Sequence, residues 1–509
     1  MEEKNVNRRG FIKGAVGVGV GAVAASLALT GCSNDASGTG ASGQTEEANW
    51  DYDVDVAVAG FGIGGAIASL AAQQAGASVV CVEAYTQVGG TSVDSGGGAS
   101  APTSLEAASA LMPYGDLDLL ETFVNSMPNA TKLVNDIGAP VRAGASDSSF
   151  TIGAESTHDS RLECFEYMAE VFTDEGGTLL METKCFELLV DESGAIEGML
   201  ARDAEGTILR IKAKSVILAC GGFQNNSELK TKFFGPYGDQ AVCRSVPTND
   251  GTGMIMAQKI GAGLSKSLGT FYGHSIAANI EHNFMEFSEI SSQYHDNRSI
   301  VINLEGKRFA DEGMGLAGDL NNQALISQRW GRGCLIFDQF IYDEWGSTTA
   351  GGTPTGVDRT KEVMDRGGRV VSADTIEELA EKISAWGYNR ASVINTIEEY
   401  NASVDAETTS DLAVPRTAGM IASIVKIAQP PFWATEVICG VSCCFGGLLI
   451  NPDAEVLKAD GGEAIPGLYA VPGTAGGITF VHYYVSSIGA AAAYGHAAAT
   501  NAVAYVNSK

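Results

Sequence analysis

Residues 55–65 read DVAVAGFGIGG, an apolar run of strand length that leads directly into a glycine-rich loop. Residues 66–76 then have the composition of a helix, and residues 77–83 form a second apolar run that ends in Glu83. The order of strand, glycine loop, helix and strand with a terminal acid is typical of dinucleotide-binding units. The sequence therefore predicts an α/β fold that holds a dinucleotide at this loop.

The glycines of the loop have distinct expected roles. Gly60 permits a tight turn, Gly62 lets backbone N–H groups approach a diphosphate, and Gly65 allows the helix to pack on the strand. Gly64 is expected to belong to the same cofactor-binding loop. The helix N-terminus supplies a positive dipole end, and Glu83 is expected to accept hydrogen bonds from the adenosine ribose hydroxyls.

Size and composition limit the remaining possibilities. The length of 509 residues suits two domains and a leader. The formal net charge of −29 argues against nucleic acid as a partner, because binding a phosphate backbone requires a basic surface. Nine of the ten cysteines follow Cys32, without the spacing of a metal or haem site. We therefore predict no metal, and we interpret these thiols as buried apolar side chains.

The first residues predict export rather than a folded element. Residues 7–13 read NRRGFIK, a twin-arginine signal, and residues 14–31 are an apolar stretch of small residues. The stretch ends in a lipobox-like LTGC, so residues 1–32 are a lipoprotein-type signal and Cys32 is the expected acylated residue, with simple cleavage nearby as the alternative. Residues 33–50 have the composition of a flexible linker. We expect an extracytoplasmic protein, anchored by lipid to the outer face of the cell membrane.

Three further segments occur in a characteristic order after the glycine loop. They are residues 88–98 (VGGTSVDSGGG), residues 215–223 (SVILACGGF) and residues 465–477, which contain IPGLYA and GTAGG. With the first loop, these segments resemble the flavoprotein family of fumarate reductase, succinate dehydrogenase and the ketosteroid dehydrogenases. The resemblance covers nearly the whole mature chain.

This resemblance implies FAD as the cofactor and a Rossmann-like FAD-binding domain split by an inserted α+β capping domain. The FAD-binding domain is expected at 51–270 and 440–509, and the capping domain at 271–439. The FAD is expected to be noncovalent, because residues 89–100 contain no histidine. Thr474 stands where the family commonly has a glutamate. The implied cofactor-binding residues are Gly89, Gly90, Thr91, Ser92, Gly97, Gly221, Gly222, Asp250, Thr474, Gly476, Gly477, Ser487 and Ile488.

The active-site positions depart from those of fumarate reductases. The resemblance places the family's substrate-binding histidine at Cys443, its C-terminal arginine at His482 or Tyr483, and its proton-donating arginine at Tyr342. The loss of cationic groups argues against fumarate or succinate, since a dry dicarboxylate site needs fixed cations. Phenols resemble the ketosteroid dehydrogenase pattern instead. The catalytic candidates are Tyr342, Tyr483, Tyr484, His482 and His274.

The resulting hypothesis is the reduction of a conjugated C=C bond in an enone steroid or an aromatic acrylate. FAD N5 delivers hydride to the β-carbon, Tyr342 protonates the α-carbon, and Tyr483 or Tyr484 holds the carbonyl oxygen. No second glycine loop suggests a nicotinamide site, and no haem motif occurs. Electrons are therefore expected from an external carrier of anaerobic respiration, which is a cytochrome, an FMN protein or a quinone-linked carrier.

Alternatives remain open at this point. The same geometry suits a ketosteroid-type dehydrogenase that passes electrons to a quinone-linked acceptor. A fumarate-type carboxylate reductase and a non-catalytic lipoprotein that binds FAD or another ligand are further possibilities. Each tyrosine also has a structural alternative as a packing residue. We interpret Arg308 as structural, in a hairpin turn at residues 306–308 with a solvated charge.

Overall fold

The computed structural model describes residues 49–282, 292–314, 319–349, 352, 354–419, 422–479 and 486–509. The predicted export signal, Cys32 and most of the linker therefore lie outside the described residues. The same is true of three catalytic candidates, His482, Tyr483 and Tyr484.

An eight-stranded sheet contains the predicted nucleotide-binding strands. Its main path runs in the order β16, β17, β9, β1, β2 and β6, and β8 extends it beside β9 with β7 beyond. The strands β2, β1, β9 and β17 pair in parallel, so their carboxyl ends share one edge. The strands are β1 (Tyr52–Ala59), β2 (Val79–Val82), β6 (Thr178–Leu180), β7 (Lys184–Val190), β8 (Ile196–Arg202), β9 (Ile208–Leu218), β16 (Glu455–Leu457) and β17 (Ala464–Ala470).

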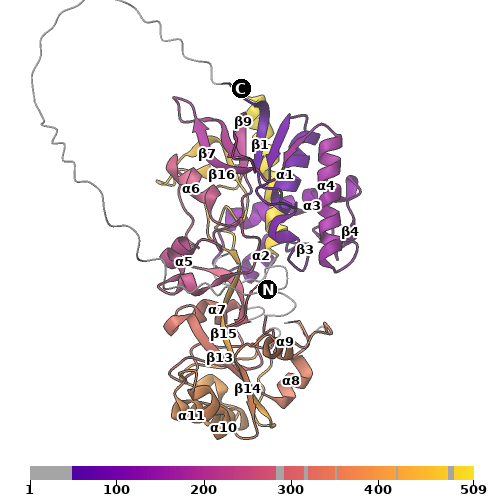
Figure 1. The fold of residues 1–509 in the computed structure, drawn as a ribbon. Helices are drawn as coiled ribbons and strands as arrows, with labels where there is room; N and C mark the ends of the chain where they lie inside the picture. Colours follow the sequence, from indigo (N-terminus) through magenta and orange to yellow (C-terminus); the bar gives the residue numbers. More distant parts are fainter. Residues whose placement is uncertain are drawn as a thin grey trace, which may run out of the picture. The chain divides into compact units, whose positions relative to one another are not determined.

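Two helices that are distant in sequence lie side by side in this part of the fold (Figure 1). α1 (Ile63–Gln74) follows the glycine loop, and α12 (Ser487–Asn507) is the C-terminal helix. Their backbones approach closely because Gly495 has no side chain, and a Cβ there would lie 2.3 Å from the Gly64 carbonyl oxygen. The alanine-rich composition of α12 therefore serves packing within the core.

Further elements surround this sheet. A small antiparallel sheet has the order β3, β5, β4 and provides part of the wall beside α12. The strands of this small sheet are β3 (Gly98–Ser100), β4 (Val141–Ala143) and β5 (Ser149–Ile152). The surrounding helices are α2 (Leu105–Leu111), α3 (Leu117–Asp136), α4 (His158–Asp174), α5 (Ser227–Phe234) and α6 (Thr252–Lys259).

A second, six-stranded sheet is organised around one long strand, β15 (Phe432–Cys444). This strand pairs with β10, β11, β13 and β14, and β12 extends the sheet beside β13. Figure 1 shows β15 running along most of the length of this sheet, and the strand crosses the expected domain boundary at residue 440. The strands are β10 (Val242–Cys243), β11 (Phe271–Ala277), β12 (Ile300–Ile302), β13 (Arg332–Asp338) and β14 (Val370–Ala373).

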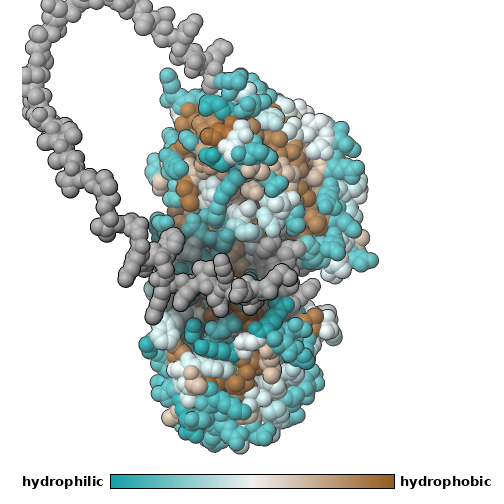
Figure 2. Space-filling model, viewed as in Figure 1, coloured by the Kyte–Doolittle hydropathy of each residue, from teal (hydrophilic) through white to brown (hydrophobic). Residues whose placement is uncertain are grey.

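Helices cover this second sheet and enclose a separate apolar core. They are α7 (Asp319–Leu325), α8 (Gln339–Trp345), α9 (Arg359–Asp365), α10 (Ile376–Ser384) and α11 (Arg390–Asp405). Leu379 and Ile383 of α10 and Ile397 of α11 are fully buried in that core. The outer faces of α10 and α11 are hydrophilic (Figure 2). The arrangement is the predicted α/β fold with a Rossmann-like part and an inserted α+β part. No helix in the described ranges is both long enough and apolar enough to cross a membrane.

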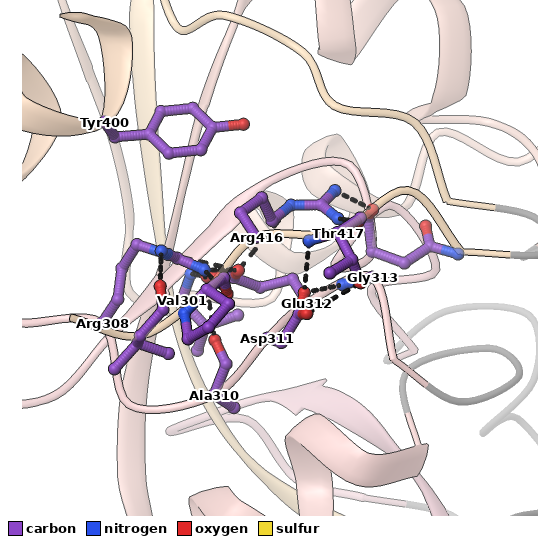
Figure 3. A network of polar contacts seen from close by, with 12 residues as sticks. Val301, Arg308, Ala310, Asp311, Glu312, Gly313, Tyr400, Arg416 and Thr417 are labelled. Atoms are coloured by element: carbon purple, nitrogen blue, oxygen red, sulfur yellow. Dashed lines mark hydrogen bonds and ion pairs between the residues drawn. The ribbon is translucent and has the colours of Figure 1, made fainter. Parts of the chain in front are cut away.

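Arg308 has the structural role that the sequence suggested, but its charge is not solvated. The hairpin turn is present, because the Gly306 N–H donates to the Asn303 carbonyl. The Arg308 guanidinium is nevertheless buried, and its Nε donates to both carboxylate oxygens of Glu312 (Figure 3). Glu312 also accepts from the Val301 N–H at 2.9 Å and faces the buried Arg416, whose Nε lies 3.7 Å away. This network holds the chain around Glu312 in place beside the apolar core of the second sheet.

Candidate functional site

A cavity of about 920 Å³ opens at the shared carboxyl edge of the parallel strands. Residues that directly follow β1, β9 and β17 line it, together with Val82 and Glu83 at the end of β2. Ligands of open α/β sheets bind at this edge. The volume lies near the upper end of the range of about 300–1,000 Å³ that is usual for ligand pockets, so the cavity suits a large ligand.

The glycine loop forms one end of the cavity, and its geometry explains its composition. Gly60 has a φ of +103°, which a side chain would strain. A Cβ at Gly65 would lie 1.8 Å from the Gly60 carbonyl oxygen, whereas a Cβ at Gly62 would meet only the Gly89 oxygen, at 3.7 Å. Gly65 is therefore required by packing, and Gly62 leaves open space in front of the backbone.

Two helix N-termini face this space. Ile63 and Gly64 at the start of α1 line the cavity, as do Ser487 and Ile488 at the start of α12. The exposed N–H groups and the dipole of a helix favour anionic groups at its N-terminus. These two helix ends therefore make the cavity suitable for the diphosphate and other electron-rich parts of a dinucleotide.

Glu83 connects the loop to β2. Its carboxylate accepts hydrogen bonds from the backbone N–H groups of Phe61 and Tyr85, both at 2.7 Å. Burial raises the pKa of this carboxyl above its usual value, and the two N–H donors oppose that shift. Glu83 fixes the loop and lines the cavity, where a ribose hydroxyl can reach its remaining lone pairs.

The cavity lining includes most of the predicted cofactor-binding residues. They are Gly60, Gly62, Gly64, Glu83, Gly90, Thr91, Ser92, Gly221, Gly222, Gly476, Ser487 and Ile488. The residues predicted for this role that do not line the cavity are Gly65, Gly89, Gly97, Asp250, Thr474 and Gly477.

Four of these residues make contacts within the fold. Gly89 and Gly97 lie against Phe165 and Arg161, where a Cβ would approach side-chain carbons to 2.6 and 3.1 Å. The Asp250 carboxylate accepts from the Thr252 N–H and pairs with Lys184, which holds the start of α6. Thr474 is buried, and its hydroxyl donates to the Gly221 carbonyl at 3.2 Å. Its contact is with the protein backbone, at the position where the family commonly has a glutamate.

Three neighbouring strands of the second sheet build the other end of the cavity. Tyr272 on β11 lies opposite Cys443 on β15, and Arg244 follows β10, with its N–H donating to the Val441 carbonyl. Arg244 extends its guanidinium to the Ser442 hydroxyl at 2.6 Å. Burial raises the pKa of the Cys443 thiol, which therefore stays protonated. The sheet pairing thus brings together residues from three separate segments.

His274 is a predicted catalytic residue that lines the cavity. The imidazole is 5% exposed and lies between two phenol rings. Its ring centre is 4.9 Å from that of Tyr272 and 4.8 Å from that of Tyr294, both in edge-on geometry. His274 therefore belongs to an aromatic cluster at the wall of the cavity.

Tyr342, the predicted proton donor, is absent from the cavity lining among the described residues. Its hydroxyl donates to Asp358 at 2.6 Å, and its ring stacks on Trp433 at 4.9 Å. Burial and the Asp358 carboxylate both raise the pKa of the phenol. The Tyr342 side chain thus packs against Trp433 and Asp358. Asp358 caps α9, so Tyr342 supports the helix that carries Arg359.

Three arginines at the cavity were not predicted from the sequence. Arg161, Arg244 and Arg359 line it. Arg359 is 2% exposed, donates to the Thr348 carbonyl at 2.9 Å, and places its guanidinium 4.8 Å from the Tyr294 ring centre. The Tyr294 hydroxyl also accepts from Arg244 at 3.4 Å. The three arginines belong to no glycine motif, and only the tertiary fold brings them together.

An α/β fold with a glycine loop and two helix ends at one cavity defines a dinucleotide-binding protein of the flavoprotein type. The chain belongs to the FAD binding domain family, whose model matches residues 153–486. A second model, described as FAD dependent oxidoreductase, matches residues 55–222. FAD is therefore the cofactor, and the open space before Gly62 and the two helix N-termini fit its diphosphate.

Relatives with named activities match over part of their length. The chain is 28% identical to an NADH:acrylate oxidoreductase of Vibrio harveyi over 72% of this chain and 34% of that protein. It is 29% identical to a urocanate reductase of Eggerthella lenta over 58% of this chain and 45% of that protein. The chain thus spans less than half the length of these curated relatives.

A solved structure shows the same fold. A 3-ketosteroid delta1-dehydrogenase from Sterolibacterium denitrificans superposes with a TM-score of 0.70 at 18% identity, covering 89% of this chain and 99% of that one. At this level of sequence identity the likeness establishes the fold, and the reaction has to be inferred from the residues of the site.

Proposed function

We propose that the protein reduces the C=C bond of an aromatic acrylate, a carboxylate conjugated to a double bond. The observation that carries this proposal is the pair of cavity arginines, Arg244 and Arg359, which both contact Tyr294. The names of the relatives are consistent with it, since they include an acrylate oxidoreductase and a urocanate reductase.

The charge of the cavity supports a carboxylate rather than a neutral steroid. Arg359 is 2% exposed, and a guanidinium removed from water is stabilised by an anion held in bidentate geometry. The sequence alone favoured a neutral or weakly polar substrate because the family's cationic positions are substituted. Arg244 and Arg359 come from other elements and supply cations in their place.

The aromatic side chains support an aromatic substituent on the substrate. Tyr272, His274 and Tyr294 stand edge to face along the cavity wall. Aromatic pairs in such arrangements contribute roughly 0.5–1.5 kcal/mol beyond simple burial. Fumarate carries no ring for these contacts, so we favour an aromatic acrylate over a dicarboxylate.

Different residues of the cavity bind the carboxylate and donate the proton. When bound, FAD supplies the hydride that adds to the β-carbon. Arg244 and Arg359 hold the carboxylate and stabilise the negative charge that develops on it. His274 or Tyr272 gives the proton to the α-carbon, because both are acid–base side chains at the cavity. Tyr483 and Tyr484 remain further candidates from the sequence.

We also propose that the protein works outside the cytoplasm with an external electron carrier. The twin-arginine signal and the LTGC segment support export and a lipid anchor at Cys32. Related proteins include a fumarate reductase (cytochrome) of Shewanella frigidimarina, whose name supports a carrier of that kind.

The test compares an acid with its ester in arginine variants. We expect Arg359→Gln to lower kcat/KM for cinnamate by roughly 10- to 150-fold, the value of one charge-assisted hydrogen bond at about 1.5–3 kcal/mol. The loss for methyl cinnamate should be less than about threefold on the same scale. Arg366→Gln provides a matched control, because Arg366 is exposed at the end of the same helix. Equal losses for acid and ester would contradict carboxylate binding.

A further inference from the structure

A buried carboxylate faces the cavity from the loop before β3. Asp94 follows the short 3₁₀ turn at Gly90–Ser92 and lines the cavity. Its side chain is 8% exposed, and neither carboxylate oxygen accepts a hydrogen bond from any residue in the described part of the chain. Burial of a carboxylate that accepts no hydrogen bond is costly, so this position calls for a function.

His158 lies directly behind Asp94 and reaches toward the solvent. It is the first residue of α4, which is capped by Thr157. Nε2 of His158 lies 3.4 Å from Oδ1 of Asp94, and Nδ1 lies 3.4 Å from Oδ1 of Asp159. The side chain of His158 is 23% exposed and that of Asp159 is 93% exposed. One imidazole therefore stands between a carboxylate in water and a carboxylate at the cavity.

We infer that Asp94 and His158 form a proton relay between the solvent and the cavity. The two ring nitrogens of histidine can take up a proton on one side while releasing one on the other. A proton from water binds at Nδ1, the proton on Nε2 passes to Asp94, and Asp94 releases its own to the cavity. A change of tautomer then restores the imidazole.

The relay supplies what the proposed reaction consumes, and in this respect it rests on the proposed function. Saturating one C=C bond takes two electrons from the external carrier and two protons from water. The residues that donate a proton to the substrate, His274 or Tyr272, must be reprotonated from water after each turnover. Asp94 is a relay residue at the cavity and does not replace those donors.

The charges around Asp94 allow it to exchange protons near neutral pH. Burial raises the pKa of Asp94 to about 6, and His158, Arg161 and Arg244 oppose this shift. Arg161 lies on α4 beside His158 and donates from Nε to the Val93 carbonyl at 2.6 Å. Tyr85 and Cys243 also face Asp94, and the pKa values of both groups are raised by burial and, to a smaller extent, by the Asp94 charge. A group of intermediate pKa passes protons efficiently in both directions.

The first test follows substrate reduction by pre-reduced holoprotein in a stopped-flow instrument. We expect Asp94→Asn to slow this step at least tenfold at pH 7, to abolish the pH dependence near 6, and to leave FAD content and KM unchanged. Asp94→Glu should restore most of the rate, and formate should restore part of it in Asp94→Ala. Asp159→Asn is the control and should stay near wild type, because water replaces an exposed carboxylate.

The second test needs no substrate and separates the relay from the proposed function. In ¹⁵N-histidine holoprotein, which has six histidines, the ring-nitrogen signals of His158 should report a different tautomer balance in Asp94→Asn than in wild type. This result together with inactivity toward every acrylate would reject the proposed function and leave the coupled pair standing. An unchanged His158 tautomer balance, a wild-type pH–rate profile in Asp94→Asn, or loss of FAD from that variant would each overturn the relay.

Discussion

Replacing Gly62 by alanine should weaken FAD binding without harming the fold. Gly62 has a φ of −70°, which alanine adopts readily, and the new Cβ would meet only the Gly89 oxygen at an ordinary 3.7 Å. Its position as N-cap of α1 costs up to about 1 kcal/mol with alanine, while the stiffer unfolded chain returns about 0.4–1 kcal/mol. The stability of the FAD-free protein should therefore change by less than about 1 kcal/mol.

The effect on the cofactor should be much larger. The added methyl group occupies the space through which the diphosphate approaches the N–H groups of α1. The loss of one charge-assisted hydrogen bond costs about 1.5–3 kcal/mol, which corresponds to a Kd for FAD roughly 10 to 150 times higher. Gly65→Ala is the matched variant, because its Cβ would lie 1.8 Å from the Gly60 oxygen and force the helix from the loop. That overpacking costs about 1–3 kcal/mol or more in the FAD-free fold itself.

The assay titrates FAD-free protein with FAD and follows the quenching of flavin fluorescence, while circular dichroism records thermal unfolding without FAD. Gly62→Ala should show a raised Kd and a wild-type unfolding midpoint, whereas Gly65→Ala should lower the midpoint. A wild-type Kd in Gly62→Ala, or an equally lowered midpoint in both variants, would refute this explanation of the loop.

Three further predictions concern other parts of the molecule. Glu312→Gln should lower the free energy of unfolding by about 3–5 kcal/mol in urea, because it leaves Arg308 and Arg416 without their buried counter-ion. A change below about 1 kcal/mol would contradict the stabilising role of this network. Asp94 has a folded pKa of about 6 against an ordinary 3.8, so its ionisation destabilises the fold as the pH rises through 6. Asp94→Asn should therefore gain up to about 3 kcal/mol over wild type at pH 8 and nothing at pH 3.5, as measured by urea unfolding at both pH values. Tyr342→Phe should keep kcat within about threefold of wild type and lose roughly 1 kcal/mol of stability with the hydrogen bond to Asp358; a kcat loss of 100-fold would return Tyr342 to the role of proton donor.

The nucleotide-binding part of the fold could be predicted because its signals are local. The apolar run at residues 55–59, the glycine loop and the terminal Glu83 specify their elements within about thirty residues. The family match confirms FAD, which the sequence had inferred by resemblance.

The substrate end of the cavity could not be predicted, because tertiary pairing creates it. Arg244 and Tyr272 reach the cavity only because β10 and β11 both pair with β15. Position along the chain also does not determine side-chain direction, and Tyr342 turns toward Asp358 and Trp433 for reasons of packing alone. Substitution of the family's cationic positions suggested a neutral cavity, although Arg359 supplies a cation from a helix without any motif.

The most direct test of the proposed function is the anaerobic reoxidation of the reduced protein. Photoreduced protein is mixed in turn with cinnamate, urocanate, methyl cinnamate, fumarate and an enone steroid, and the return of oxidised flavin absorbance is recorded with the identity of the product. We predict that cinnamate or urocanate reoxidises the flavin fastest and is recovered as the saturated acid. Faster reoxidation by the enone steroid, or by fumarate, would contradict the assignment of the cavity to an aromatic acrylate.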